Sequence, residues 1–262
     1  MKLKLGISTC PNDTYIFGAM IKGLVPHNFE FDLYMDDVQV LNELAIKGEA
    51  DVVKVSYGVV PAVKDRYKIL RTGGALGFGC GPLVVSAENV SVESLRGNKI
   101  AIPGVNTSAF RFFKMFFGED FEFVELRFDM IMPAIASKQV AAGVIIHEGR
   151  FIYQQQGLEK LCDLGELYEE KFKSPIPLGA IIIRNELLHI AQDITEVIRL
   201  SINYADAHYD NIKDFVKLHA QEMDDSVIKN HIQLYVNKYS KDVTPAIGGL
   251  CSFLGADESV FV

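Results

Sequence analysis

The chain of 262 residues contains no Trp and only four Cys. Neighbouring cysteines in the sequence lie 70 or more residues apart, and none is close to another Cys or a His at the spacing of a zinc site. We therefore expect free thiols in a reducing compartment and no metal centre. The four residues are Cys10, Cys80, Cys162 and Cys251.

Positive charge is also scarce in this sequence. The 26 Lys and Arg residues are outnumbered by 34 Asp and Glu residues, so the formal net charge is −8. No cluster of Lys and Arg supplies the basic face that a nucleic-acid-binding protein needs. Nucleic acid is thus excluded as a partner, and no particular oligomeric state is predicted.

Long apolar runs are missing as well. No segment approaches the roughly 20 apolar residues that cross a bilayer, which excludes membrane insertion. Residues 1–7 begin with basic character but lead to no long apolar region and no small-residue cleavage site. We expect them to form the first β-strand of a cytoplasmic protein.

The remaining composition, 49% hydrophobic with 21 Gly and 9 Pro, is typical of a globular protein with one large or two modest domains. Short β-rich runs alternate with helical patterns, and several of these runs are apolar almost throughout, as in strands covered by helices on both faces. This pattern predicts an α/β fold. The expected strands span 3–8, 29–35, 51–56, 67–72, 82–87, 99–103, 121–126, 143–147 and 178–184.

Helices are expected between these strands. Apolar residues recur at helical spacing over 38–45, behind the possible N-cap Asp36-Asp37. Further helices are expected over 107–117 and around 131–136. From 193 to 258 the pattern predicts helices only.

A weak internal repeat indicates two similar α/β lobes. Residues 3–8 resemble 98–103, and residues 45–56 resemble 136–147, at offsets of 95 and 91 residues. The repeat places Ser56 and His147 at corresponding strand ends. Because ligands of open α/β sheets bind beyond the carboxyl ends of the strands, we expect a ligand in the cleft between the lobes.

The expected division is a discontinuous large lobe of residues 1–87 and 182–262 and a small lobe of residues 88–181. Two crossing strands would form a hinge, as in a bilobal binding-protein fold. The glycine-rich segment 73–81 lacks the Gly-Lys-Ser/Thr ending of a phosphate loop, so we expect a cleft edge there rather than a nucleotide site.

Two helix starts share one pattern, Ser-Thr-Cys-Pro-Asn-Asp-Thr at 8–14 and Pro-Gly-Val-Asn-Thr-Ser-Ala at 103–109. Each is either an ordinary capped helix start or a set of N–H groups and hydroxyls that receive an anion. Their matching positions in the two lobes favour a shared carboxylate or phosphate site. Cys10 could have a lowered pKa there, but no general base lies beside it in the sequence, which disfavours a nucleophilic role.

Two strand ends carry titratable residues. Alternation sets Lys54 and Ser56 on one strand face, so Lys54 either extends to solvent or faces the cleft as a fixed charge. His147 follows an apolar strand and precedes Glu148-Gly149-Arg150. It is either a proton-exchanging residue or a structural histidine bonded to a loop. We expect no metal ligand among the other histidines, which are His27, His189, His208, His219 and His231.

Six ordered segments resemble the MqnD family of 1,4-dihydroxy-6-naphthoate synthases, from the futalosine route to menaquinone. The most specific are Cys-Pro-Asn-Asp-Thr at 10–14 and Ile-His-Glu-x-Arg-Phe at 146–151. The sequence departs from the family at Thr9, where proline is expected, at Gly149, where serine also occurs, and at Ile152, where threonine is usual. The six segments are 8–17, 54–57, 71–77, 81–85, 146–153 and 177–180.

The resemblance implies a type II periplasmic-binding-protein-like fold used for catalysis, without a metal or organic cofactor. It implies a small-molecule carboxylate substrate, cyclic dehypoxanthinyl futalosine, cleaved to 1,4-dihydroxy-6-naphthoate and a sugar-derived fragment. The proton-accepting histidine of the family falls on His147. Its substrate-contacting segments fall on Lys54, Val55 and Ser56 and on Thr107, Ser108 and Ala109. We add the hypothesis that Asp13 or Asn12 completes the polar pocket on lobe closure.

Two other functions share this fold. The sister enzyme chorismate dehydratase is one, although the His-Glu-Gly-Arg cluster at 147–150 favours the synthase. A non-catalytic solute-binding or sensor module is the other. Such a module usually carries an export signal or a fused DNA-binding domain, and neither is expected here.

Overall fold

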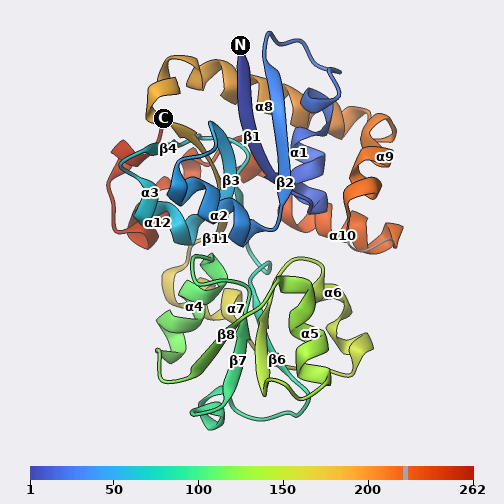
Figure 1. Cartoon of the computed structure of the whole chain (residues 1–262), viewed down its shortest axis with the longest axis vertical. Coiled ribbons are helices and arrows are strands. Elements are labelled where there is room, and N and C mark those ends of the chain that lie inside the picture. Colours follow the sequence, from blue (N-terminus) through green and yellow to red (C-terminus); the bar gives the residue numbers. More distant parts are fainter. Residues whose placement is uncertain (221–223) are drawn as a thin grey trace.

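A computed structural model describes residues 1–220 and 224–262 and consists of two α/β lobes, each built on its own sheet (Figure 1). In the first sheet the order is β2 (Glu30–Asp36), β1 (Lys2–Ser8), β3 (Val52–Ser56), β11 (Ile176–Arg184) and β4 (Tyr67–Ile69), and β5 (Ala75–Gly77) also pairs with β11. In the second it is β10 (Glu159–Asp163), β6 (Leu83–Ser86), β9 (Ala142–Ile145), β7 (Lys99–Ile102) and β8 (Glu122–Glu125).

Twelve α-helices of the described residues cover these sheets. The first lobe holds α1 (Pro11–Ile21), α2 (Val38–Lys47), α3 (Val60–Val63), α8 (Ala191–Ala207), α9 (Asp210–His219), α10 (Asp225–Tyr235), α11 (Lys238–Lys241) and α12 (Ile247–Leu254). The second holds α4 (Ser108–Phe117), α5 (Phe128–Ala136), α6 (Gly149–Ile152) and α7 (Leu164–Phe172). No helix of the described ranges has both the length and the apolar content for a bilayer span.

The central strands β3 and β11 of the first sheet are buried on both faces. Along β11, Ile181 and Ile183 belong to a core shared with α1 and α8. The alternate residues Ala180 and Ile182 belong to a core shared with α2 and α12. Because successive side chains of a strand point to opposite faces, a continuous apolar run fills both layers.

The second sheet is filled in the same way. Ile100 and Ile102 of β7 pack in one core with Phe113 of α4. Ala101, between them, packs on the other face with Ile131 of α5. Alternate positions of one strand therefore serve two helical layers.

The internal repeat appears in the strand pairing. β1 pairs in parallel with β2 and β3, and β7 pairs in parallel with β8 and β9. Each of these triplets then carries one antiparallel strand, β11 beside β3 and β6 beside β9. Both lobes thus bring the carboxyl ends of their parallel strands toward the segment that joins them.

The predicted strands are all present, with shifted ends. β4 stops at Ile69 rather than at residue 72, and two further strands, β5 and β10, had no clear sequence signal. β5 has three residues, too few to show a period, and the pairing of β10 with β6 is interrupted by an irregularity between Lys160 and Cys162. In the described part of 193–258 the regular structure is helical, as predicted.

The helix starts follow local capping rules. The Asp37 side chain accepts a hydrogen bond from the backbone N–H of Gln39 and begins α2. Thr107 caps α4 in the same manner. The helix starts predicted from the capping residues at 37 and 107 are therefore confirmed.

Sheet membership bears on where the lobes divide. β6 pairs only within the second sheet, whereas β11 joins the first sheet from Ile176 onward. An apolar strand buries its side chains equally well in either sheet, so its sequence does not indicate which of the two sheets it joins. We propose that the crossings lie at 78–82 and 173–175, a few residues before the boundaries at 87/88 and 181/182 expected from the sequence.

Candidate active site

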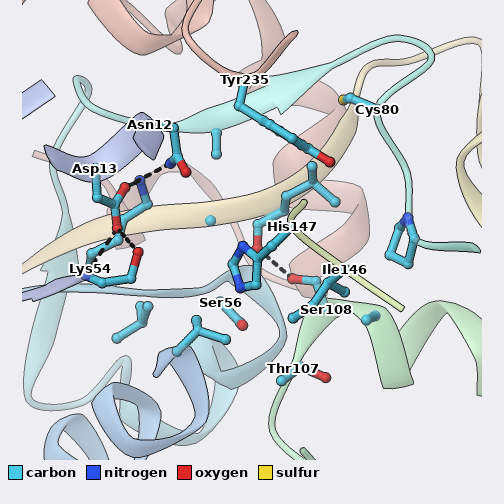
Figure 2. A pocket seen from close by; sticks show the side chains of 18 of the residues that line it. Asn12, Asp13, Lys54, Ser56, Cys80, Thr107, Ser108, Ile146, His147 and Tyr235 are labelled. Atoms are coloured by element: carbon cyan, nitrogen blue, oxygen red, sulfur yellow. Dashed lines mark hydrogen bonds and ion pairs between the residues drawn. The ribbon is translucent and has the colours of Figure 1, made fainter. Parts of the chain in front are cut away.

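A cavity lies between the lobes at the ends of parallel strands (Figure 2). Ser8 ends β1, Ser56 ends β3 and His147 follows β9, so the wall forms where α/β proteins usually bind ligands. The cavity is lined by all nine residues singled out from the sequence. These are Asn12, Asp13, Lys54, Val55, Ser56, Thr107, Ser108, Ala109 and His147.

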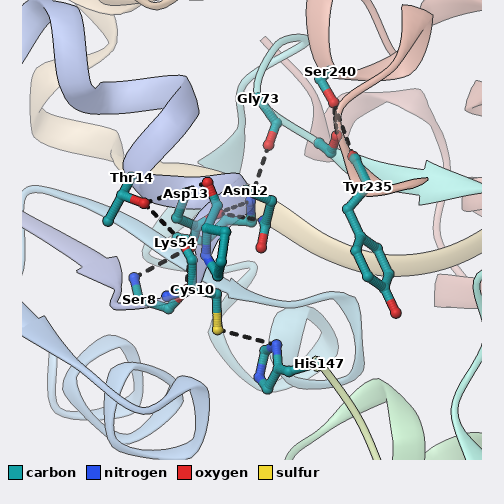
Figure 3. A network of polar contacts seen from close by, with 12 residues as sticks. Ser8, Cys10, Asn12, Asp13, Thr14, Lys54, Gly73, His147, Tyr235 and Ser240 are labelled. Atoms are coloured by element: carbon teal, nitrogen blue, oxygen red, sulfur yellow. Dashed lines mark hydrogen bonds and ion pairs between the residues drawn. The ribbon is translucent and has the colours of Figure 1, made fainter. Parts of the chain in front are cut away.

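Lys54 is buried in this wall and does not extend to solvent. Its Nζ donates to Asp13 Oδ1 at 2.6 Å and to the Gly73 carbonyl at 3.2 Å, with Lys54 4% exposed and Asp13 1% exposed (Figure 3). The Ser8 hydroxyl donates to Asp13 Oδ2 at 2.7 Å. A buried charge is costly without a partner, and the Asp13 carboxylate compensates the charge of Lys54. Both oxygens of Asp13 are engaged in hydrogen bonds.

Thr107 uses its hydroxyl within its own helix start. Oγ1 donates to the Gly104 carbonyl at 2.7 Å and accepts from the Phe110 N–H at 3.2 Å. The ordinary capping interpretation of this residue is therefore correct for its side chain. Within the described residues the N–H groups of Ser108 and Ala109 in the first turn make no hydrogen bond, as expected at a helix start.

Ser108, in the second lobe, hydrogen-bonds two segments of the first lobe. Its Oγ donates to the Leu178 carbonyl at 2.8 Å and accepts from the Gly58 N–H at 3.0 Å. The Ser56 hydroxyl, in contrast, makes no hydrogen bond within the described part of the chain, although Ser56 is only 4% exposed. Of these two serines, Ser56 thus has the hydroxyl that a bound molecule can use.

His147 occupies an unusual backbone position two residues after β9. Its φ of 54° lies in the left-handed region, which a non-glycine residue adopts only when its surroundings impose it. Nε2 is buried and has no hydrogen-bond partner within the described residues. Burial lowers the pKa of His147 to about 4, a shift that Asp13 opposes and Lys54 reinforces. The imidazole is neutral near pH 7 and can accept a proton.

Cys10 touches His147 from the other lobe. Its Sγ lies 3.1 Å from His147 Nδ1 (Figure 3). Burial, aided by the Glu148 carboxylate, raises the pKa of the Cys10 thiol well above its usual value. The lowered pKa considered from the sequence is therefore wrong, because desolvation outweighs the N-terminus of α1. The thiol stays protonated, which disfavours a nucleophilic role.

Cys10, His147 and Glu148 also bring three possible metal-ligand atoms within 4.8 Å of one another. In the described part of the chain this is the group that could hold a metal ion. Two of these atoms, Cys10 Sγ and His147 Nδ1, lie at hydrogen-bonding distance. A hydrogen bond with one proton between them accounts for their close approach.

His231 is a titratable cavity residue that the sequence interpretation did not assign to the site. It lies on α10, is fully buried, and its Nε2 is 2.9 Å from Asn12 Oδ1. Its ring is stacked against that of His147, with centroids 6.4 Å apart and planes 22° apart. Burial lowers its pKa well below the usual value, and the nearby His147 lowers it further. The one available signal was a histidine on an apolar helix face, four residues before Tyr235.

These features define the class of two-lobed proteins with a periplasmic-binding-protein-like fold and an interlobe site. The alkanesulfonate-binding protein SsuA from Xanthomonas axonopodis pv. citri shares this fold, with a TM-score of 0.71 at 11% identity over 96% of this chain and 90% of that one. A crystal structure of a protein from Archaeoglobus fulgidus is more similar, with a TM-score of 0.91 at 31% identity over 97% and 95% of the two chains.

The family model described as menaquinone biosynthesis matches residues 3–255, and this chain belongs to that family. Two curated relatives are both named 1,4-dihydroxy-6-naphtoate synthase. The one from Thermus thermophilus is 43% identical over 92% of this chain and 88% of its own length. The one from Streptomyces coelicolor is 41% identical over 92% and 87%.

Proposed function

We propose that this protein is a carbon–carbon lyase that converts cyclic dehypoxanthinyl futalosine into 1,4-dihydroxy-6-naphthoate, with His147 as the general base. The observation that carries the proposal is the buried Nε2 of His147 in the cavity wall, which has no hydrogen-bond partner among residues 1–220 and 224–262. Two relatives at 41–43% identity that bear the synthase name support it. No resident metal or organic cofactor enters the proposed chemistry.

The chemical step begins with proton transfer from a substrate hydroxyl to Nε2 of neutral His147. As the oxygen forms a carbonyl, the adjacent carbon–carbon bond breaks and its electron pair moves into the ring system. The ring becomes aromatic, which favours product, and the sugar-derived fragment leaves with the carbonyl. A base that is neutral at pH 7 and rigidly held suits this role.

We place the carboxylate of the substrate between the first turn of α4, in the second lobe, and the end of β3, in the first. The N-terminus of α4 supplies the N–H groups of Ser108 and Ala109, which carry a partial positive charge. Ser56 supplies a hydroxyl from β3. Lys54, held by Asp13, adds a fixed positive charge to the same wall. Binding the carboxylate here would fix the substrate relative to His147 and exclude water.

Product chromatography with cyclic dehypoxanthinyl futalosine tests this function. Wild type should form the naphthoate, and His147→Ala should lose about 10²-fold or more in kcat. His189→Ala is a matched control, because that histidine is exposed on the first lobe and does not line the cavity. Turnover that survives His147→Ala would remove the base from the mechanism.

The same assay separates the alternatives. Dehydration of chorismate in place of cleavage would identify the chorismate dehydratase activity. Binding of the futalosine derivative with no product from folded wild type would identify a solute-binding or sensor module. Either result would contradict the proposed lyase.

A further inference from the structure

His231 lies in the wall of the cavity, although it is 84 residues away from His147 in the sequence. It belongs to α10 of the first lobe, while His147 belongs to the second (Figure 1). The proposed proton transfer leaves His231 without a role. A fully buried histidine at a cavity, where an apolar residue would be less costly to bury, calls for a physical reason.

Its hydrogen-bond polarity follows from a chain of contacts that starts at Lys54. Asp13 accepts from Lys54 at 2.6 Å and from Asn12 Nδ2 at 2.8 Å (Figure 3). A carboxylate paired with an ammonium group only accepts, so the amide nitrogen of Asn12 must face Asp13. The Asn12 Oδ1 therefore faces His231 Nε2, 2.9 Å away.

An amide oxygen cannot donate, so His231 Nε2 must carry the proton in this contact. Burial keeps the ring neutral, and a neutral imidazole has one N–H only. Nδ1 is consequently a bare acceptor. It is buried and has no hydrogen-bond partner within the described residues, which is a costly arrangement unless a ligand supplies the donor.

We infer that Nδ1 of His231 accepts a hydrogen bond from a hydroxyl of the bound substrate. This inference rests on the proposed function and extends it. The cavity then presents two unprotonated imidazole nitrogens, Nε2 of His147 as the base and Nδ1 of His231 as a binding acceptor. Such a pair recognises a polyhydroxylated carboxylate rather than a simple aromatic acid, because each nitrogen requires a donor.

Two substitutions separate the two ring nitrogens. His231→Gln places an amide nitrogen near the Nε2 position, which preserves the donor to Asn12 and removes the Nδ1 acceptor. His231→Asn places an amide oxygen near the Nδ1 position and loses the contact with Asn12. The inference predicts that His231→Gln raises KM about 5- to 10-fold, with a smaller change in kcat, whereas His231→Asn raises KM less.

An analogue of the substrate that lacks one sugar-derived hydroxyl supplies the decisive readout. Wild type should bind the analogue missing the contacted hydroxyl about 5- to 10-fold more weakly than the full substrate. The His231→Gln variant should bind both equally. A purely structural role for His231 would leave this discrimination intact in the variant, and that result would overturn the inference. Circular dichroism and thermal unfolding would show that both variants are folded.

Failure of the role inferred for His231 can be told apart from failure of the proposed lyase function. If wild type makes no product, calorimetric binding of the same pair of compounds to wild type and His231→Gln still tests the contact. If wild type turns over and His231→Gln retains its KM, kcat and discrimination, the lyase function stands and the role of His231 fails.

Discussion

The Sγ of Cys10 and the Nδ1 of His147 lie 3.1 Å apart, although 137 residues separate them in the chain. Cys10 directly precedes α1 of the first lobe, and His147 follows β9 of the second. The contact therefore joins the two lobes. If Nδ1–H donates to the sulfur, Nε2 keeps its lone pair toward the cavity, so closure itself would prepare the base.

We expect Cys10→Ala to lower kcat about 10-fold with little change in KM, because the ring would lose its positioning contact while the carboxylate site is untouched. Steady-state kinetics measure both values. Cys10→Ser keeps an oxygen acceptor for Nδ1–H and should retain more activity than Cys10→Ala. Equal activity in both variants and wild type would show that this contact does not position His147.

The ion pair between Lys54 and Asp13 leads to a second prediction. Asp13→Asn would leave the buried ammonium group uncompensated and should lower the free energy of unfolding by about 3 to 5 kcal/mol. It should also impair kcat or KM, because Lys54 and Asn12 are both oriented by the carboxylate. Urea unfolding and steady-state kinetics measure the two effects.

Asp225→Asn is the control for that variant. Asp225 pairs with Lys213 and Lys217 at the surface, where solvent screens the charges, so its substitution should change the free energy of unfolding far less. If Asp13→Asn left kcat and KM both unchanged, the hypothesis that Asp13 helps to complete the polar pocket would be abandoned, whatever its effect on stability.

The buried histidines predict a loss of stability in mild acid. The pKa of His147 is about 4 in the folded protein, against a usual value of 6.5. Between these values the unfolded chain binds more protons than the folded one, so the free energy of unfolding falls as pH decreases from 6.5 toward 4. From pH 7 to pH 5, His147 should contribute a loss of at most about 2 kcal/mol. His231 acts in the same direction.

Urea unfolding at pH 7 and pH 5 measures this dependence. His147→Asn removes the titrating group, so its free energy of unfolding should depend less on pH than that of wild type. His189→Ala removes an exposed histidine and should leave the dependence unchanged. An identical pH slope in His147→Asn and wild type would show that this histidine is not held in its neutral form by the fold.

Local patterns in the sequence predicted much of the architecture. The apolar runs identified β6, β9 and β11 because strands covered on both faces must be apolar at consecutive positions. Asp37 and Thr107 marked helix starts because a side-chain acceptor there satisfies N–H groups of the first turn. The expected positions of Ser56 and His147 at strand ends also hold, since the carboxyl ends of both parallel sets meet at one cavity.

Other features depend on residues that are far apart in the chain. The pattern at 52–56 left open whether Lys54 faced solvent or the cleft, and the answer depended on Asp13 from another element. The direction of the Cys10 pKa shift depended on burial and on Glu148, which no local pattern reveals. β6 joined the second sheet because β9 and β10 pair with it there.

The sequence by itself determined the α/β class, the helical carboxyl-terminal segment and the family resemblance, because each is written in local spacing or in contiguous motifs. Of the nine cavity residues, Val55 and Ala109 were expected from the resemblance alone. Only the tertiary structure decided that Cys10 meets His147 across the lobes and that His231 enters the cavity through Asn12. The physical reason is that periodicity reports which face of an element is buried. Which side chains meet on that face is decided by packing between elements.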